Sequence, residues 1–129
     1  MLPVKIEIIS LGKLSREYAP LIREYEKRIS SLAHARFSEG AKIPENSLLL
    51  DLRGREMDSD EFYELIRKKS ARGEKLVFVI GPPEGFENVE GYERISLSKM
   101  TFQHDLARLV LLEQIYRALL RMKGTRYEK

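Results

Sequence analysis

The sequence predicts a small three-layer α/β domain with a mostly parallel sheet. Strand-like and helix-like segments alternate along the chain in the order β-α-β-β-α-β-β-α. Two strand segments, 47–52 and 75–80, are almost continuously apolar, as is typical of parallel strands covered on both faces. With 129 residues and no visible linker or repeat, the chain is expected to form one domain over residues 1–129.

The first half of the chain supplies three of these segments. Residues 4–9 alternate charged and apolar side chains and predict a strand that Gly12 ends. Helical spacing of apolar residues predicts a helix over about 15–31, with its regular part starting near Pro20, where a missing amide costs least. Residues 33–38 alternate weakly and predict a short strand. The polar segment 39–46 is expected to be a loop.

The second half begins with the apolar strand 47–52, which Arg53-Gly54-Arg55 is expected to end. Asp58 and Glu61 form the pattern of a capping box and predict a helix over 59–71 that Gly73 closes. Residues 75–80 form the strongest predicted strand and run directly into a turn, Gly81-Pro82-Pro83-Glu84-Gly85. Another short strand is predicted over 94–97.

A long helix is predicted to begin after an N-cap at Thr101 and to end at Gly124. Apolar residues lie on two sides of it, so most of the helix must be buried. One side is expected to face the sheet and carries Leu106, Leu109, Val110, Tyr116 and Leu120. The other is expected to face a partner subunit and carries Leu112, Ile115, Leu119 and Met122.

Composition excludes several classes of protein. The chain has no cysteine and only two histidines, so neither a disulfide framework nor a metal site is expected. No apolar run approaches the ~18 residues of a membrane span, and the first residues do not resemble a signal peptide. A cytoplasmic protein without a membrane partner is therefore expected.

Positive charge is concentrated near the end of the chain. Residues 104–129 contain six basic residues and three acidic ones, so their net charge of +3 equals that of the whole chain. Such a surface could contact the phosphates of a nucleic acid, or it could be a solvated helix face. The sequence leaves both readings open.

The carboxyl ends of parallel strands meet at one edge of a sheet, which is where open α/β sheets bind ligands. The loops after 48–52, 76–80 and 94–97 should therefore meet there. The turn 81–85 is a poor phosphate cradle, because two prolines remove amide donors. His104 is a candidate proton shuttle, although a histidine near a helix start often only caps or packs. Ser96 and Ser98 lack the pattern of a nucleophile elbow, so a hydrolase is not expected.

Three motifs together resemble the RlmH-type members of the SPOUT methyltransferase class. They are F-V-I-G-P-P-E-G at 78–85, I-S-L-S-K-M-T at 95–101 with His104 and Arg108, and E-Q-I-Y-R-A at 113–118. The resemblance implies a homodimer with a C-terminal trefoil knot that uses S-adenosylmethionine to methylate N3 of a pseudouridine in 23S ribosomal RNA. It implies a cofactor site made of Leu50, Asp51, Gly81, Leu97, Ser98, Lys99, Met100, Thr101 and Phe102. His104, Arg108 and Tyr127 are the catalytic candidates, with Arg108 as an electrostatic partner.

The chain departs from the pattern of that family in three places. Pro82 stands where a second glycine is common, so an amide at that position has no counterpart here. Glu128 replaces the histidine of the terminal P-Y-H-[RK] motif, and a helix expected between 38 and 47 is missing. Two rivals remain: a non-catalytic RNA-binding module that uses the basic C-terminal surface, and a small nucleotide-binding domain with its phosphate site at 81–85.

Overall fold

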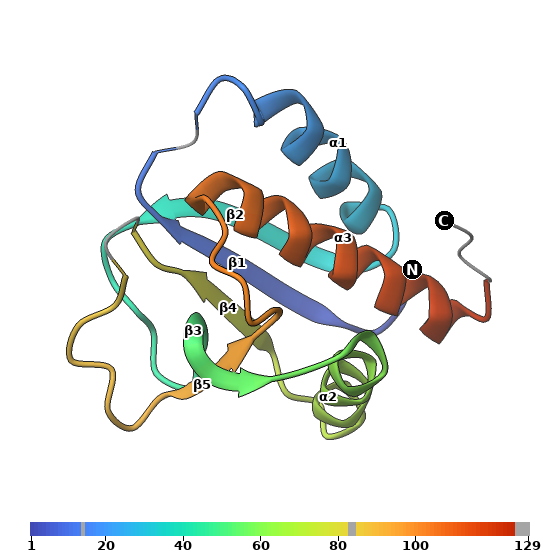
Figure 1. Ribbon diagram of the computed structural model, residues 1–129. Coiled ribbons are helices and arrows are strands. Elements are labelled where there is room, and N and C mark those ends of the chain that lie inside the picture. The colour runs from blue at the N-terminus through green and yellow to red at the C-terminus, as the bar shows by residue number, and fades with distance from the viewer. Residues whose placement is uncertain (14, 83–84, 126–129) are drawn as a thin grey trace.

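The computed structural model describes residues 1–13, 15–82 and 85–125. Its elements follow the predicted order (Figure 1): β1 Lys5–Leu11, α1 Ala19–Ser30, β2 His34–Gly40, β3 Leu48–Glu56, α2 Ser59–Ala71, β4 Leu76–Ile80, β5 Glu93–Ser96 and α3 His104–Lys123. The α/β class is confirmed. The sheet has the order β2-β1-β4-β3-β5, and every pair in it is parallel.

The two faces of the sheet are covered differently. Alternating residues of β4 divide between them: Leu76, Phe78 and Ile80 join a core with side chains of all three helices, while Val77 and Val79 belong to a second cluster. The second cluster is completed by loop residues, which are Ile43, Phe86, Val89 and Tyr92. The third layer of the domain is thus formed by loops and not by a helix. Figure 1 shows α1 and α3 crossing the same face of the sheet.

Two predicted helix starts can be compared with the structure. The capping box of α2 is confirmed, because the Asp58 carboxylate accepts from the Glu61 amide at 2.8 Å and the Glu61 carboxylate accepts from the Asp58 amide at 3.1 Å. Helix α1 begins at Ala19, which confirms that its regular part starts near Pro20, while residues 15–18 of the predicted segment are not helical. This start keeps Pro20 in the first turn, and it leaves the Ser15 amide to bond with Asp105 at 3.0 Å.

The N-cap of α3 is Gln103, so the prediction of Thr101 was wrong. The Gln103 side-chain oxygen accepts from the amides of Asp105 and Leu106 at 2.9 and 3.0 Å. Its longer side chain thus satisfies helix amides that a threonine two residues earlier cannot reach. The predicted end is confirmed, because Gly124 adopts a left-handed conformation with φ of 87°.

Strand β3 does not end at Arg53-Gly54-Arg55 as predicted. Its pairing with β5 passes from Leu50 opposite Ile95 to Arg55 opposite Ile95, so residues 51–54 form a bulge within the strand. A Cβ atom on Gly54 would lie 2.6 Å from the backbone of Arg94 and Ile95. The glycine therefore does not break the strand but lets two backbones approach each other closely.

The prediction that one apolar side of α3 faces a partner subunit was also wrong. Leu112, Ile115 and Leu119 have no exposed surface and lie in the core of their own subunit. The side expected to face the sheet, with Leu106, Leu109, Tyr116 and Leu120, is only partly buried. Spacing alone reveals two apolar sides but does not tell which of them is inside. The homodimer stays a prediction, but Leu112 cannot belong to its surface.

Because Leu112 is fully enclosed, we expect Leu112→Ala to lower the free energy of unfolding by about 2–5 kcal/mol, through lost burial and a residual cavity. Leu21→Ala is the matched control, since Leu21 lies on α1 with 54% of its surface exposed. It should change stability by about 0.5 kcal/mol or less. Urea unfolding of both variants measures the difference, and equal losses would show that Leu112 is not in the core.

Candidate functional site

A cavity of about 190 Å³ lies at the carboxyl edge of the sheet, beside the start of α3. Its walls come from the ends of β3, β4 and β5 and from the segments that follow them. This is the convergence that the parallel topology predicts, because β3 pairs with both β4 and β5. The candidate site is therefore assembled from three segments far apart in the sequence.

Most of the predicted cofactor residues lie in this cavity. The residues that line it include Leu50, Asp51, Gly81, Leu97, Ser98, Met100, Thr101 and Phe102. Lys99 is exposed and does not line it. Among the catalytic candidates, His104 lines the cavity and Arg108 does not, while Tyr127 lies outside the described residues. The structure brings these residues together, and their binding role stays a prediction.

Two serines shape the loop after β5. The Ser96 hydroxyl donates to the Ser98 carbonyl at 2.7 Å, and the Ser98 hydroxyl accepts from the Met100 amide at 2.9 Å. Both hydroxyls thus bond within the loop, which fits their assignment as structural residues and not nucleophiles. The loop leaves the Met100 side chain 75% exposed at the rim of the cavity.

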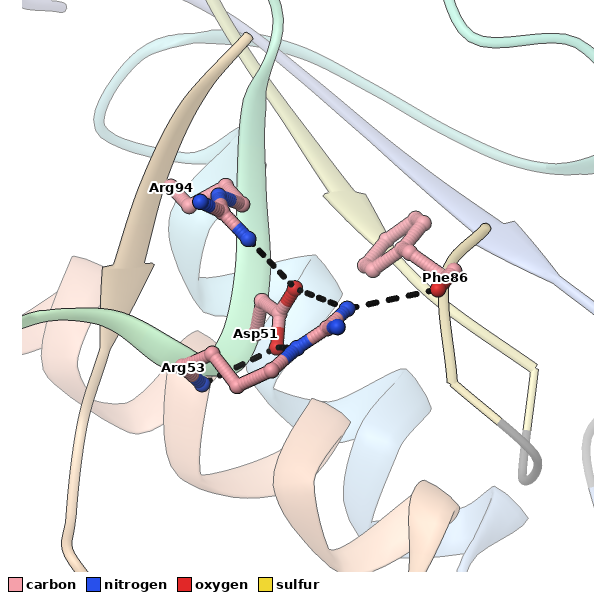
Figure 2. Close-up of polar contacts among 4 residues, drawn as sticks. All are labelled: Asp51, Arg53, Phe86 and Arg94. Carbon is pink, nitrogen blue, oxygen red and sulfur yellow. Dashed lines mark hydrogen bonds and ion pairs between the residues drawn. The ribbon is translucent and has the colours of Figure 1, made fainter. Parts of the chain in front are cut away.

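Asp51 is the acidic residue among the described lining residues, and two arginines hold it (Figure 2). Its carboxylate accepts from the Arg53 amide at 3.0 Å, from Arg53 Nε at 3.3 Å and from Arg53 Nη2 at 3.1 Å. Arg94 Nη1, on β5, lies 3.7 Å from the same carboxylate. Arg53 Nη2 also donates to the Phe86 carbonyl at 3.3 Å. One guanidinium therefore connects the bulge of β3 to the loop that follows β4.

These contacts set the charge of Asp51. Burial pushes the pKa of its carboxyl upward, but the hydrogen bonds from the Arg53 side chain and amide, together with the charges of Arg53 and Arg94, outweigh burial. The pKa of Asp51 consequently lies below its ordinary value, so the cavity contains an ionised carboxylate at neutral pH.

Gly81 gives Phe86 its place in the cavity wall. A Cβ atom at position 81 would lie 2.9–3.1 Å from three atoms of the Phe86 ring. Phe86 is 9% exposed and belongs to the cluster on the loop-covered face. The absence of a side chain at position 81 is thus required for close packing of the Phe86 ring. The ring contributes both to the cavity wall and to the second cluster.

His104, Asp105 and Arg108 form a buried polar cluster in the first turns of α3, next to Glu26 of α1. His104 Nδ1 lies 3.2 Å from Asp105 Oδ1, and Arg108 Nη2 donates to Glu26 of α1 at 2.9 Å. Arg108 is only 4% exposed. Two other arginines of the predicted basic surface also have acidic partners. Arg117 pairs with Glu113 at 2.8 Å, and Arg121 pairs with Asp60 at 2.7 Å.

A second cavity of about 300 Å³ lies between α2 and α3 and is lined by Arg117, Arg121 and Asp60 among others. None of the predicted site residues lines it, so the smaller cavity is the better candidate despite its size. Within residues 1–13, 15–82 and 85–125, no three His, Cys, Asp or Glu side chains are grouped as a metal site. Over the same described residues, no helix is long and apolar enough to cross a membrane.

Sequence reasoning missed several residues of the site. Phe86 was overlooked because it follows a turn in a polar segment, although an isolated aromatic residue there is itself a signal. Arg53 was read only as part of a strand-ending triplet, and nothing local indicates that Arg94 approaches Asp51 across 43 positions of sequence. Asp105 has a sequence-distant partner in Ser15 and could not be singled out.

The fold and the cavity define an α/β protein with a cavity at the carboxyl edge of a parallel sheet, where such folds bind ligands. A family model described as "Predicted SPOUT methyltransferase" matches residues 39–128. The chain belongs to this family of methyltransferases, whose reaction requires a methyl donor.

Curated relatives agree with this assignment. A protein of Coprothermobacter proteolyticus named "Ribosomal RNA large subunit methyltransferase H" is 37% identical, and the alignment covers 98% of this chain and 100% of the relative. Proteins of the same name from Mycoplasma mobile and an Anaeromyxobacter species are 35% and 32% identical, with the same coverage. The alignments span 139, 148 and 153 positions, more than the 129 residues of this chain, so these relatives carry insertions relative to it.

The Asp51 cluster makes stability depend on pH. Since the folded pKa of Asp51 is depressed, its contribution is present above the unfolded pKa of about 3.9 and is lost as pH falls through the folded pKa. We expect Arg53→Gln to raise the pKa of Asp51 and to lower the free energy of unfolding at neutral pH. The difference from the wild type should shrink below about pH 4.

Carboxyl NMR titration and urea unfolding across pH measure both effects. Arg23→Gln, at an exposed position of α1, is the control for the same change in charge. An unchanged pKa of Asp51 in Arg53→Gln would show that Arg53 does not hold the carboxylate ionised.

Proposed function

We propose that this protein transfers a methyl group from S-adenosylmethionine to N3 of a pseudouridine in large-subunit (23S) ribosomal RNA. The observation that carries the proposal is the cavity at the carboxyl edge, where the segments around Leu50, Gly81 and Leu97–Phe102 meet. The relatives named as large-subunit ribosomal RNA methyltransferases support the choice of substrate.

The lining of the cavity fits the proposed cofactor. Leu50, Ile80, Phe86, Leu97 and Phe102 provide apolar walls that suit a purine ring. Among the described lining residues there is a carboxylate, Asp51, and no lysine or arginine. S-adenosylmethionine supplies an electrophilic methyl group on a positively charged sulfur. The described lining places no cationic side chain in the cavity against that charge, and Asp51 is already paired with Arg53 and Arg94. The same lining disfavours a nucleotide triphosphate, whose phosphates require cations or a cradle of amides.

The chain's own residues then have distinct roles in the proposal. Apolar walls and main-chain groups of the 97–102 loop hold the donor in position, because in-line methyl transfer depends mainly on orientation. His104 is the candidate that accepts the proton of the ring nitrogen. Arg108 is bound to Glu26 and does not line the cavity, so its burial argues against direct contact with RNA within one subunit. Tyr127 and the homodimer remain proposals drawn from the family resemblance, as does the trefoil knot.

A non-catalytic RNA-binding module is the alternative, and it would bind RNA regardless of any methyl donor. Its main support was the basic C-terminal surface. The pairing of Arg108, Arg117 and Arg121 with carboxylates weakens that support.

We therefore expect S-adenosylmethionine to stabilise the folded protein, by about 2.7 kcal/mol at a concentration 100-fold above Kd. Calorimetry and thermal unfolding measure this, with ATP as the contrasting ligand. Transfer of tritium from the labelled methyl group should occur to 23S RNA or large subunits that contain pseudouridine, and not to an otherwise identical RNA that contains uridine. Equal labelling of both RNAs would exclude pseudouridine as the target, and RNA binding without any cofactor effect would favour the alternative.

The proposed cofactor site also predicts the effect of Gly81→Ala. The new methyl group would displace Phe86 from the cavity wall, so affinity for S-adenosylmethionine should fall by tenfold or more, about 1.4 kcal/mol. Gly40→Ala is the matched control, because a Cβ there meets Ile9 at an ordinary 3.4 Å and Gly40 lies at the end of edge strand β2. Calorimetry on folded variants gives the comparison. Unchanged affinity in Gly81→Ala would remove this position from the site.

A further inference from the structure

Asp105 and His104 form a buried pair at the first turn of α3. Their side chains are 4% and 6% exposed, and His104 Nδ1 lies 3.2 Å from Asp105 Oδ1. The other carboxylate oxygen, Oδ2, accepts from the Ser15 amide at 3.0 Å. The carboxylate is thus fixed from two sides, by the segment that precedes α1 and by the imidazole.

This arrangement specifies which nitrogen of His104 carries the proton. An ionised carboxylate can only accept hydrogen bonds, so Nδ1 must donate to it. The bonds from Ser15 and His104 favour the ionised form: burial pushes the pKa of Asp105 upward, but these contacts outweigh it and leave the pKa below its ordinary value. In the neutral imidazole, Nε2 then carries a lone pair and no proton.

The unprotonated nitrogen has no described partner within the protein. His104 lines the candidate cavity, and its Nε2 is buried without a hydrogen-bond partner among the described residues. A buried acceptor without a partner costs about 1–3 kcal/mol, so the free protein maintains an unfavourable feature at this point. A donor group on a bound molecule would satisfy it.

Charged groups surround the imidazole. The Asp105 carboxylate lies at Nδ1, and Arg108 lies one turn along α3 from His104. Glu26 of α1 pairs with Arg108 at 2.9 Å, so this guanidinium already has an acidic partner within the protein.

We propose that Asp105 is a positioning residue that sets the tautomer of His104, so that Nε2 can take the proton from the substrate's N–H. The proposal rests on the proposed function. In the balanced step, the ring nitrogen loses its proton to Nε2 and forms a bond to the methyl carbon. The carbon–sulfur bond breaks, and its electron pair stays on sulfur, which becomes a neutral thioether. The imidazolium that results is stabilised by the Asp105 carboxylate. Since Nε2 is shielded from solvent in the free protein, the segments that cover the ring must move when RNA binds.

The first test measures the tautomer directly in the wild type. With ¹⁵N-labelled histidine, NMR should show His104 protonated at Nδ1 and unprotonated at Nε2 at neutral pH. His34, the other histidine, is exposed and provides the reference for an unconstrained ring. A spectrum with the proton of His104 on Nε2 overturns the proposal, whether or not the protein methylates RNA.

The second test changes the partner of the ring. In Asp105→Asn, the amide oxygen can keep the Ser15 bond while the amide nitrogen donates to Nδ1, so the proton of His104 should move to Nε2. With bound S-adenosylmethionine, the methylation rate should then fall by about 100-fold or more, while cofactor affinity is retained. Asp60→Asn is the control, because the Asp60 side chain is 83% exposed. This substitution should leave the methylation rate within about twofold of the wild type.

The outcomes separate the two proposals. If Asp105→Asn moves the proton to Nε2 and the rate is unchanged, Asp105 has no part in the reaction. If the proton stays on Nδ1 in the folded variant, Asp105 does not set the tautomer. If the wild type shows the expected tautomer but transfers no methyl group to any RNA, the proposed function fails, and with it the proton-transfer role of the pair.

Discussion

The parallel pairing of β3 with both β4 and β5 is the constraint on which the site depends. It places the carboxyl ends of three strands side by side, and the segments that leave them form one cavity. The close approach of β3 and β5 is possible only because Gly54 has no side chain, since a Cβ would overlap the backbone of Arg94 and Ile95. The bulge beside Gly54 then places Asp51 in the cavity wall.

Loops serve as a structural layer in this domain. Phe86, Val89, Tyr92 and Ile43 cover the face of the sheet opposite the helices. Phe86, in the loop after β4, also lines the cavity, so the cavity wall and the second cluster share this side chain. Arg53 links this loop to β3 through Asp51 and the Phe86 carbonyl. A substitution that displaces Phe86 in the cavity wall should therefore also disturb the packing of the loop-covered face.

Charge is distributed in a way that the net value does not reveal. Three of the basic residues that suggested a nucleic-acid surface, Arg108, Arg117 and Arg121, are paired with Glu26, Glu113 and Asp60, whereas Lys123 is exposed. The cavity contains an ionised carboxylate, Asp51, which is likewise paired, with Arg53 and Arg94, and its described lining has no cationic side chain. The described lining therefore offers no cation to a phosphate group, although the chain as a whole is positively charged.

The sequence by itself determined the α/β class, the order of all the elements, the limits of α2 and the meeting of three loops at one edge. These features follow from local patterns: apolar period, capping residues and the rule for parallel strands. The tertiary structure alone decided which side of α3 is buried, that loops form the third layer, and that Arg108 pairs with Glu26, 82 positions away. Local periodicity cannot distinguish two apolar sides of one helix, and side-chain partners distant in sequence are fixed only when the elements pack.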